Sequence, residues 1–280
     1  MDSLVFAAVL LAAAAHAGWN ATIKRGLDPL LVTVLIAIGA GALALPLLLA
    51  TGLPAAPARP WVIGSVLIHL GYFAGLIEAY RAGDMSQVYP VARGSAPLLT
   101  ALASTAWLGE RLGPLGWIGL LCLVGGVLLL SRRGGDGLKL DRRAVGFALF
   151  TALTICGYSV VDGVGARAAG DATAYIAALF VGNAVIMTAY GLARRGPKLL
   201  GDMRAVWLQG LAGGGLQLGS YWVVVWAMTV APIAIVAALR ETSVLFGALI
   251  AVVILKEPLR ALRVAAALLI VAGLVMIRLH

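Results

Sequence analysis

Long apolar runs, separated by short polar connections, follow one another along the whole chain. Each run has 18 to 27 residues and ends at charged residues, proline or glycine. About 20 helical residues cross the hydrocarbon core of a bilayer, and the runs lack the polar–apolar alternation of a membrane β-strand. The pattern predicts ten transmembrane helices, near 3–23, 30–50, 61–82, 86–108, 114–131, 144–168, 172–193, 204–230, 232–255 and 260–278.

The amino-acid composition agrees with a membrane environment. Of the 280 residues, 62% are hydrophobic and only 12% are charged, against about half and about a quarter in soluble domains. Ten crossings use roughly 200 residues, which leaves no room for a separate soluble domain. The first run is interpreted as a helix and not as a cleaved signal peptide, because no positive charge precedes it. The predicted fold class is an all-α membrane protein.

Basic residues fall mainly on one side of the predicted membrane. Fifteen of the 21 Lys and Arg residues lie in alternate connections, the first of which holds Lys24 and Arg25, and four lie on the opposite side. Positively charged connections stay in the cytoplasm, so both termini are predicted to face away from it. The net charge of +9 is therefore interpreted as a topology signal and not as a nucleic-acid-binding surface.

The two halves of the chain repeat one another. A shift of 147 residues places Arg93 on Arg240, Glu110 on Glu257, Ser95 on Thr242 and Gly126 on Gly273, and a shift of 139 places Gly18-Trp19-Asn20 on Gly157-Tyr158-Ser159. We therefore predict two five-helix repeats, residues 1–135 and 136–280. Because five is odd, the second repeat enters the membrane in the opposite sense. Inverted repeats are typical of transporters whose substrate site lies near the bilayer midplane.

Motifs in both halves resemble those of a known family. The first half contains Gly18-Trp19-Asn20 with Lys24, and a stretch from Gln87-Val88-Tyr89-Pro90-Val91-Ala92 to Leu108-Gly109-Glu110-Arg111-Leu112; the second contains Ala231-Pro232-Ile233-Ala234 and Lys256-Glu257-Pro258. These motifs resemble EamA-type proteins of the drug/metabolite transporter superfamily, and within it YddG-type exporters of aromatic amino acids. The resemblance implies export of amino acids or other small metabolites across a bacterial inner membrane. It also implies a cavity walled by the first, third, fourth, sixth, eighth and ninth helices.

Two arginines lie inside predicted helices, where a charge costs about 2.5–3.5 kcal/mol on insertion scales. Arg93 and Arg240 occupy equivalent places in the two repeats. One interpretation is a cationic site for a substrate carboxylate, which arginine binds through two parallel hydrogen bonds. The alternatives are internal pairing, of Arg240 with Asp162 or Glu78 and of Arg93 with a carbonyl, and snorkelling to the interface.

Aromatic and polar side chains accompany these arginines. The third helix carries His69, Tyr72, Phe73 and Tyr80 on one stripe, which indicates either helix packing or one wall of a pocket. The predicted substrate-binding residues are Trp19, Asn20, Tyr72, Tyr80, Arg93, Tyr158, Asp162, Tyr221 and Arg240.

Acidic residues suggest two further roles. Glu110 and Glu257 come just before the fifth and tenth helices, where a carboxylate complements free N–H groups at a helix start. Glu78, Asp162 and Glu241 are the acidic residues placed within the membrane, so any proton coupling is predicted to involve one of them. Asp162 is the leading candidate because it lies nearest the middle of its helix.

The sequence lacks the motifs that ATP hydrolysis and metal binding require. The sequence has no G-x-x-x-x-G-K-[ST] phosphate loop and no metal-ligand cluster, and its three histidines are dispersed. We therefore expect no enzyme activity, no cofactor and no metal.

The predicted function is a secondary transporter that exports apolar or aromatic amino acids by alternating access. The alternatives are a carrier of cationic drugs or sugar-phosphate-like metabolites, an intramembrane enzyme and a channel. The expected partners are a small-molecule substrate and the lipid bilayer, and the choice between monomer and homodimer stays open.

Overall fold

The computed structural model of the protein describes residues 1–23, 28–82, 85–130, 142–253 and 261–279, without the side chains of 19–23, 80–82, 85–91, 250–251 and 253. All regular structure in these residues is helical. The elements are α1 (Ser3–Ile23), α2 (Pro29–Thr51), a short 3₁₀ turn η1 (Ala56–Ala58), α3 (Arg59–Ala82), α4 (Met85–Leu108), α5 (Pro114–Leu130), α6 (Arg142–Ala169), α7 (Ala172–Arg195), α8 (Lys198–Met203), α9 (Trp207–Val230), α10 (Ile233–Arg240), α11 (Ser243–Val253) and α12 (Ala261–Leu279).

The observed helices follow the predicted apolar runs closely. Most described residues of each predicted run are helical; the exceptions are 204–206, which form a turn before α9, and 232 and 241–242. The outer ends of the predicted runs agree with the observed ones to within three residues. Among the described residues, five helices are long and apolar enough to cross a membrane, at Pro29–Thr51, Ala56–Ala79, Arg142–Ala169, Ala172–Arg195 and Ala261–Leu279. Ser3–Gly18 and Pro114–Leu130 are shorter apolar helices. The fold is that of an all-helical membrane protein.

One predicted helix is divided in two. The run 232–255 forms α10 and α11, separated at Glu241 and Thr242. The N–H groups of these two residues donate to carbonyls three residues back, at Ala238 and Leu239, over 3.1 Å each. This 3₁₀ geometry is tighter than an α-helix and in mid-helix often marks a functional hinge. Neither Gly nor Pro marks the division in the sequence, so the apolar pattern did not predict it.

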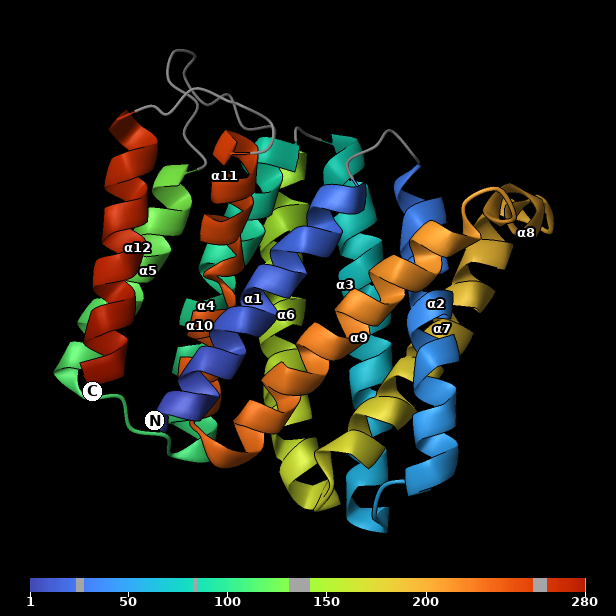
Figure 1. Ribbon diagram of the computed structural model, residues 1–280, viewed down its shortest axis with the longest axis horizontal. Coiled ribbons are helices and arrows are strands. Elements are labelled where there is room, and N and C mark those ends of the chain that lie inside the picture. The colour runs from blue at the N-terminus through green and yellow to red at the C-terminus, as the bar shows by residue number, and fades with distance from the viewer. Residues whose placement is uncertain (24–27, 83–84, 131–141, 254–260, 280) are drawn as a thin grey trace.

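Closely packed helix pairs form the two edges of the molecule, as Figure 1 shows. At one edge α5 lies along α12, and a Cβ added to Gly119 would be 2.8 Å from the carbonyl oxygen of Gly273. At the other edge α2 packs on α7 and α9, and a Cβ added to Gly214 would collide with the backbone nitrogen of Ala40. Only small residues allow backbones this close. Glycines therefore allow the close helix contacts at both edges, and α1, α3, α4, α6 and α10 lie between them.

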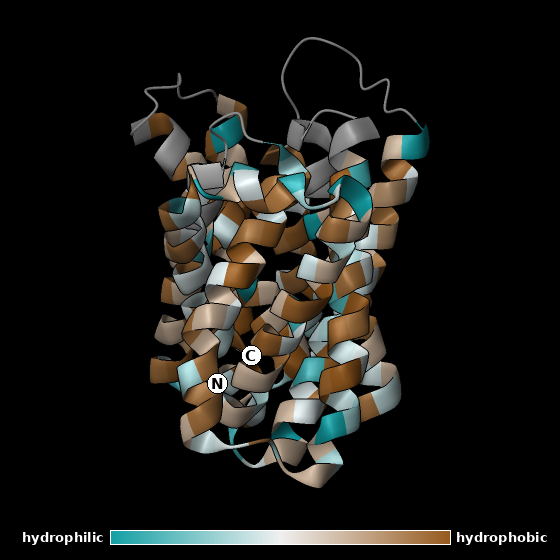
Figure 2. Ribbon diagram, turned by 90° about the vertical axis from the view of Figure 1, so that its right-hand side faces the viewer, coloured by the Kyte–Doolittle hydropathy of each residue, from teal (hydrophilic) through white to brown (hydrophobic). Residues whose placement is uncertain are grey.

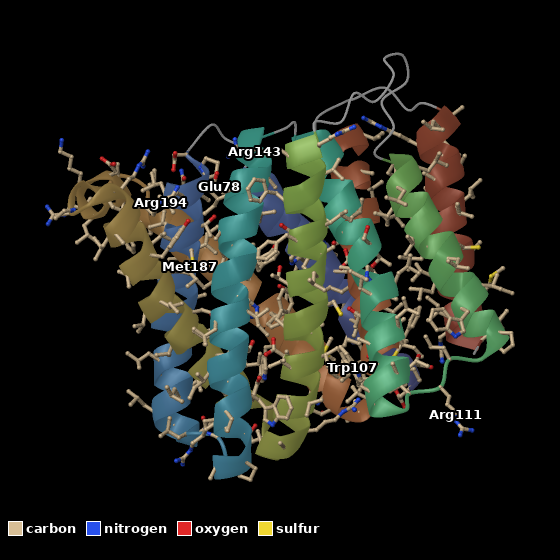
Figure 3. The ribbon with its side chains drawn as sticks, turned by 180° about the vertical axis from the view of Figure 1, so that it is seen from behind. Glu78, Trp107, Arg111, Arg143, Met187 and Arg194 are labelled. Atoms are coloured by element: carbon tan, nitrogen blue, oxygen red, sulfur yellow. The ribbon has the colours of Figure 1, made fainter. Side chains whose placement is uncertain are left out.

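The outer surface is apolar over most of its height. Figure 2 shows mainly hydrophobic residues between the two ends of the molecule, and exposed side chains include Trp107, which is 79% exposed. Charged side chains gather near the ends in Figure 3, with Glu78, Arg143 and Arg194 at one end and Arg111 at the other. A surface of this kind is stable against lipid. Both chain termini lie at the end that holds Arg111 (Figures 1 and 3).

Glu110 connects the two halves of the chain. Its carboxylate oxygens accept hydrogen bonds from the backbone N–H groups of Ile233 (2.9 Å) and Ala234 (3.2 Å), in the first turn of α10. The expectation that Glu110 supports the start of its own helix, α5, is therefore wrong: it caps a helix, but one of the second half. Its repeat equivalent, Glu257, lies outside the described residues.

Arg167 completes this contact at the end of α6. Its guanidinium pairs with Glu110 at 3.2 Å and donates to the carbonyl oxygens of Met228 (2.9 Å) and Ala231 (3.0 Å), where α9 ends. Four chain segments therefore meet at one charged cluster: the connection before α5, the end of α6, the end of α9 and the start of α10. We call Glu110 and Arg167 with these backbone groups the Glu110 cluster.

Candidate functional site

A narrow cavity lies in the centre of the bundle. It is lined by Ala12 and His16 of α1, Ala37 of α2, His69, Tyr72 and Phe73 of α3, Arg93 of α4, Tyr158 of α6, Phe180 and Asn183 of α7, Gln217, Ser220, Tyr221 and Val224 of α9, and Arg240 of α10. The six helices expected to wall the cavity all contribute. The expectation is incomplete, however, because α7 adds two side chains and α2 adds one alanine.

The cavity is small in this state of the protein. Its volume is about 50 Å³, which suits a few water molecules, whereas sites for small-molecule ligands have about 300–1,000 Å³. An amino acid therefore enters only if the helices around the cavity move apart.

Two arginines and one glutamate form the charged side of the cavity. Arg93 and Arg240 are both buried, and Glu241 is fully buried beside them. The Nε atom of Arg93 lies 2.8 Å from Oε2 of Glu241, and the Nε atom of Arg240 lies 3.5 Å from Oε1. The alignment at these atoms is poor for hydrogen bonds, so both contacts are ion pairs held by distance and charge. One carboxylate therefore lies against two guanidinium groups.

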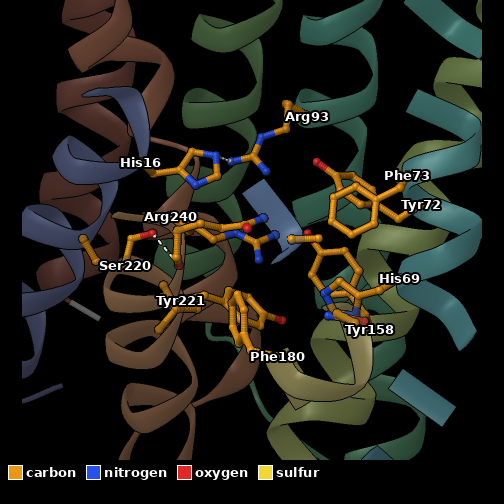
Figure 4. A pocket seen from close by; sticks show the side chains of 15 residues that line it. His16, His69, Tyr72, Phe73, Arg93, Tyr158, Phe180, Ser220, Tyr221 and Arg240 are labelled. Atoms are coloured by element: carbon orange, nitrogen blue, oxygen red, sulfur yellow. Dashed lines mark hydrogen bonds between the residues drawn. The ribbon is translucent and has the colours of Figure 1, made fainter. Parts of the chain in front are cut away.

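Other polar groups approach the far end of the Arg93 guanidinium. Its Nη2 atom is 3.5 Å from Nε2 of His16 and 3.4 Å from the hydroxyl of Ser243. Figure 4 shows the side chains of Arg93, His16 and Arg240 converging from three helices on the same space. Both guanidinium groups therefore line the cavity, and Glu241 contacts each of them at its Nε atom.

Aromatic rings form the opposite side of the cavity (Figure 4). His69 stacks on Tyr158 with ring centroids 4.3 Å apart, and Tyr72 and Tyr221 meet Tyr158 edge-on at 5.6 Å and 6.0 Å. The guanidinium carbon of Arg240 lies 5.5 Å from the centroid of the Tyr158 ring, within reach of a cation–π interaction. The rings and the arginines are therefore neighbours in one site.

Asp162 supports this aromatic side from behind. It is fully buried and accepts hydrogen bonds from the hydroxyl groups of Tyr221 (2.5 Å) and Tyr175 (2.9 Å). The predicted pairing of Arg240 with Asp162 or Glu78 is wrong: Arg240 pairs with Glu241, and Glu78 pairs with Arg194 near the end of the bundle. Arg93 also pairs with Glu241.

The structure brings five of the nine predicted site residues together around the cavity: Tyr72, Arg93, Tyr158, Tyr221 and Arg240. Asp162 is close to them but does not line the cavity. The side chains of Trp19, Asn20 and Tyr80 lie outside the described part of the structure.

Sequence reasoning missed His16, Phe180 and Ser220 as lining residues, and Glu241 as the partner of both arginines. His16 had been weighed only as a metal ligand. Ser220 precedes Tyr221 and follows Gln217 by three positions, a helical spacing that could have indicated it. Phe180 precedes Asn183 by the same spacing. For Glu241 the available signal was a charge adjacent to a buried arginine.

The arrangement suits binding more than bond-breaking chemistry. Guanidinium groups bind carboxylates, and aromatic walls bind apolar or aromatic groups. Within the described ranges, no three His, Cys, Asp or Glu residues gather to hold a metal ion.

Comparison with known proteins agrees with this description. The model of the EamA-like transporter family matches the chain twice, over residues 3–132 and 142–279. The spermidine export protein MdtI of Enterobacter sp. (strain 638) is 33% identical over 74 residues, which are 26% of this chain and 68% of that protein. One crystal structure, described only as that of a protein, superposes with a TM-score of 0.77, covering 99% of this chain and 96% of its own. At 22% identity, this last similarity shows the fold alone.

Proposed function

Because this chain belongs to the EamA-like transporter family, a family of multi-pass membrane transporters and not of enzymes, we propose that it exports small metabolites, namely amino acids with apolar or aromatic side chains. The observation that supports this most is the central cavity. There, two guanidinium groups face a cluster of aromatic rings. A carboxylate and an aromatic group on one small molecule match these two sides. Aromatic specificity of the YddG type is the narrower form of this proposal.

A cationic substrate is the second candidate. It is favoured by the relative whose name describes spermidine export. Spermidine carries several positive charges and no carboxylate, however, and the cavity presents Arg93 and Arg240 to it. Like charges in a buried site repel strongly, because little water screens them. The charge of the lining residues therefore supports a substrate that carries a carboxylate.

Alternating access between two inverted repeats is the proposed mechanism. The family model matches each half separately, and the boundary between the matches falls near the predicted division between residues 1–135 and 136–280. Ten crossings in two repeats of five would place the cavity between the halves. The Glu110 cluster, which joins the halves at the end of the molecule that holds both termini, would then hold that end closed. We propose the bacterial inner membrane as the location.

Counterflow in proteoliposomes tests the proposal. Vesicles preloaded with one unlabelled compound are diluted into labelled phenylalanine, and uptake is compared with that of empty vesicles. A carrier of this class shows faster uptake with phenylalanine or tryptophan inside, and no acceleration with spermidine inside. Acceleration by spermidine alone would establish the second candidate. A channel would show no acceleration by any compound.

A further inference from the structure

We propose that Glu241 sets the net charge that this site accepts, and so selects zwitterionic amino acids over carboxylates that lack an amino group. The proposal deepens the proposed function, since it concerns the substrate of the same cavity. It starts from the charge count beside the cavity, where two guanidinium groups and one carboxylate lie in contact.

The internal repeat accounts for the presence of an arginine in each half, but it does not account for Glu241. Arg93 and Arg240 are equivalent, whereas the position equivalent to Glu241 is Gly94. A Cβ added to Gly94 would lie 3.0 Å from Cδ2 of Leu128, so a larger residue has little room there. The Glu241 charge is therefore present in only one half, at the point where α10 ends and α11 begins. Asp162, buried behind Tyr221, is the second carboxylate of the site, so two carboxylates balance the two guanidinium charges.

The position of Glu241 fits a positioning residue. It is fully buried and does not line the cavity, so a substrate meets the arginines first. Its oxygens lie against the Nε atoms of both arginines, and both guanidinium groups line the cavity. A guanidinium group binds a carboxylate through two parallel hydrogen bonds. Glu241 therefore orients the two groups that would bind the substrate.

The same carboxylate favours a substrate that also carries an ammonium group. In a water-poor site, charges a few ångströms apart interact strongly. A zwitterion brings one negative and one positive charge, which the arginines and Glu241 match together. A simple carboxylate brings only the negative charge. Replacing Glu241 by glutamine would raise the positive charge beside the cavity by one unit and would favour the simple carboxylate.

Three variants change the charged groups beside the cavity, and a fourth variant serves as the control. Glu241→Gln has one more positive charge than the wild type, Arg93→Gln has one fewer, and the double variant has the same charge as the wild type. The Glu78→Gln variant is the control, because Glu78 pairs with Arg194 away from the cavity. The probe is 3-phenylpropionate, which has the ring and carboxylate of phenylalanine but no amino group. Binding is measured by isothermal titration calorimetry of the purified protein, as the concentration of 3-phenylpropionate that half-saturates the site.

We expect Glu241→Gln to bind 3-phenylpropionate at least about tenfold more tightly than the wild type, the size of one charge-assisted interaction. The double variant should return to the wild-type value, and Glu78→Gln should not change it. If Glu241→Gln does not fold, the double variant is compared with Arg93→Gln, because these two proteins differ only at position 241. The double variant should then bind 3-phenylpropionate at least about tenfold more tightly than Arg93→Gln.

Equal binding with and without Glu241 in folded protein would overturn the proposal, as would absence of binding in every variant. A merely structural Glu241 would lower the unfolding temperature without changing the half-saturating concentration. The assay needs no transport. Failure of the proposed function would appear instead as absence of phenylalanine counterflow by the wild type.

Discussion

Glu110 is expected to control access to the cavity from the end of the molecule that holds both termini. Its two hydrogen bonds to Ile233 and Ala234 cap α10, and losing such a cap costs about 0.5–2 kcal/mol. The charge at the helix start adds about 0.3–1 kcal/mol. The ion pair with Arg167 adds little, because that side chain is 37% exposed and solvent screens it. The total is about 1–3 kcal/mol, which is roughly a five- to hundredfold change in an equilibrium.

If these bonds form only when this end is closed, their loss shifts the protein towards the open state by that factor. The assay uses a cysteine at position 220, which lines the cavity, in a protein whose two native cysteines are replaced. A membrane-impermeant maleimide is added on the side of the termini. We expect Glu110→Ala to raise the labelling rate at least fivefold, and Glu110→Gln to raise it less, because the amide oxygen still accepts a hydrogen bond.

The matched control is Glu78→Gln, which loses an ion pair at the opposite end and should not raise labelling from this side. The reasoning would be refuted if Glu110→Ala lowered the unfolding temperature and left the labelling rate unchanged. Glu110 would then stabilise α10 in every state and would not control access.

Two further predictions concern orientation and coupling. Because basic residues lie mainly in alternate connections, a C-terminal reporter that is active only in the cytoplasm should stay inactive; strong activity would reverse the predicted topology. Asp162→Asn removes the charge that accepts hydrogen bonds from Tyr175 and Tyr221, so we expect slower transport and, if protons are coupled here, a weaker pH dependence. Unchanged rate and pH dependence, measured in proteoliposomes at several pH values, would exclude Asp162 from both roles.

Much of the fold could be predicted because lipid imposes a simple rule. A helix that crosses the bilayer needs a long apolar run, so the positions of the helices followed from hydropathy. The division between α10 and α11 could not be predicted in this way. It depends on local backbone hydrogen bonds at Glu241 and Thr242, within a run that is apolar on both sides.

The site was predictable to a smaller extent. Arg93, Arg240 and the tyrosines were recognisable because polar groups inside a membrane helix need a partner or a function. Their partners were not recognisable, since pairing depends on how different helices face one another in the folded bundle. Asp162 is the clearest example: it is bonded to two tyrosine hydroxyl groups, whereas charge alone favoured an arginine. His16 was missed for the same reason, because only the packing of α1 brings it to Arg93.

The claim that an arginine binds the substrate carboxylate is tested most directly by Arg240→Gln. The measurement compares uptake of phenylalanine with uptake of phenethylamine, which lacks the carboxylate, in proteoliposomes holding equal amounts of folded protein. Losing a charge-assisted hydrogen bond costs about 1.5–3 kcal/mol, or roughly ten- to a hundredfold in affinity. We predict that the apparent affinity for phenylalanine falls by that factor while that for phenethylamine does not fall. An equal loss for both compounds would contradict the account, because it would show that Arg240 does not bind the carboxylate.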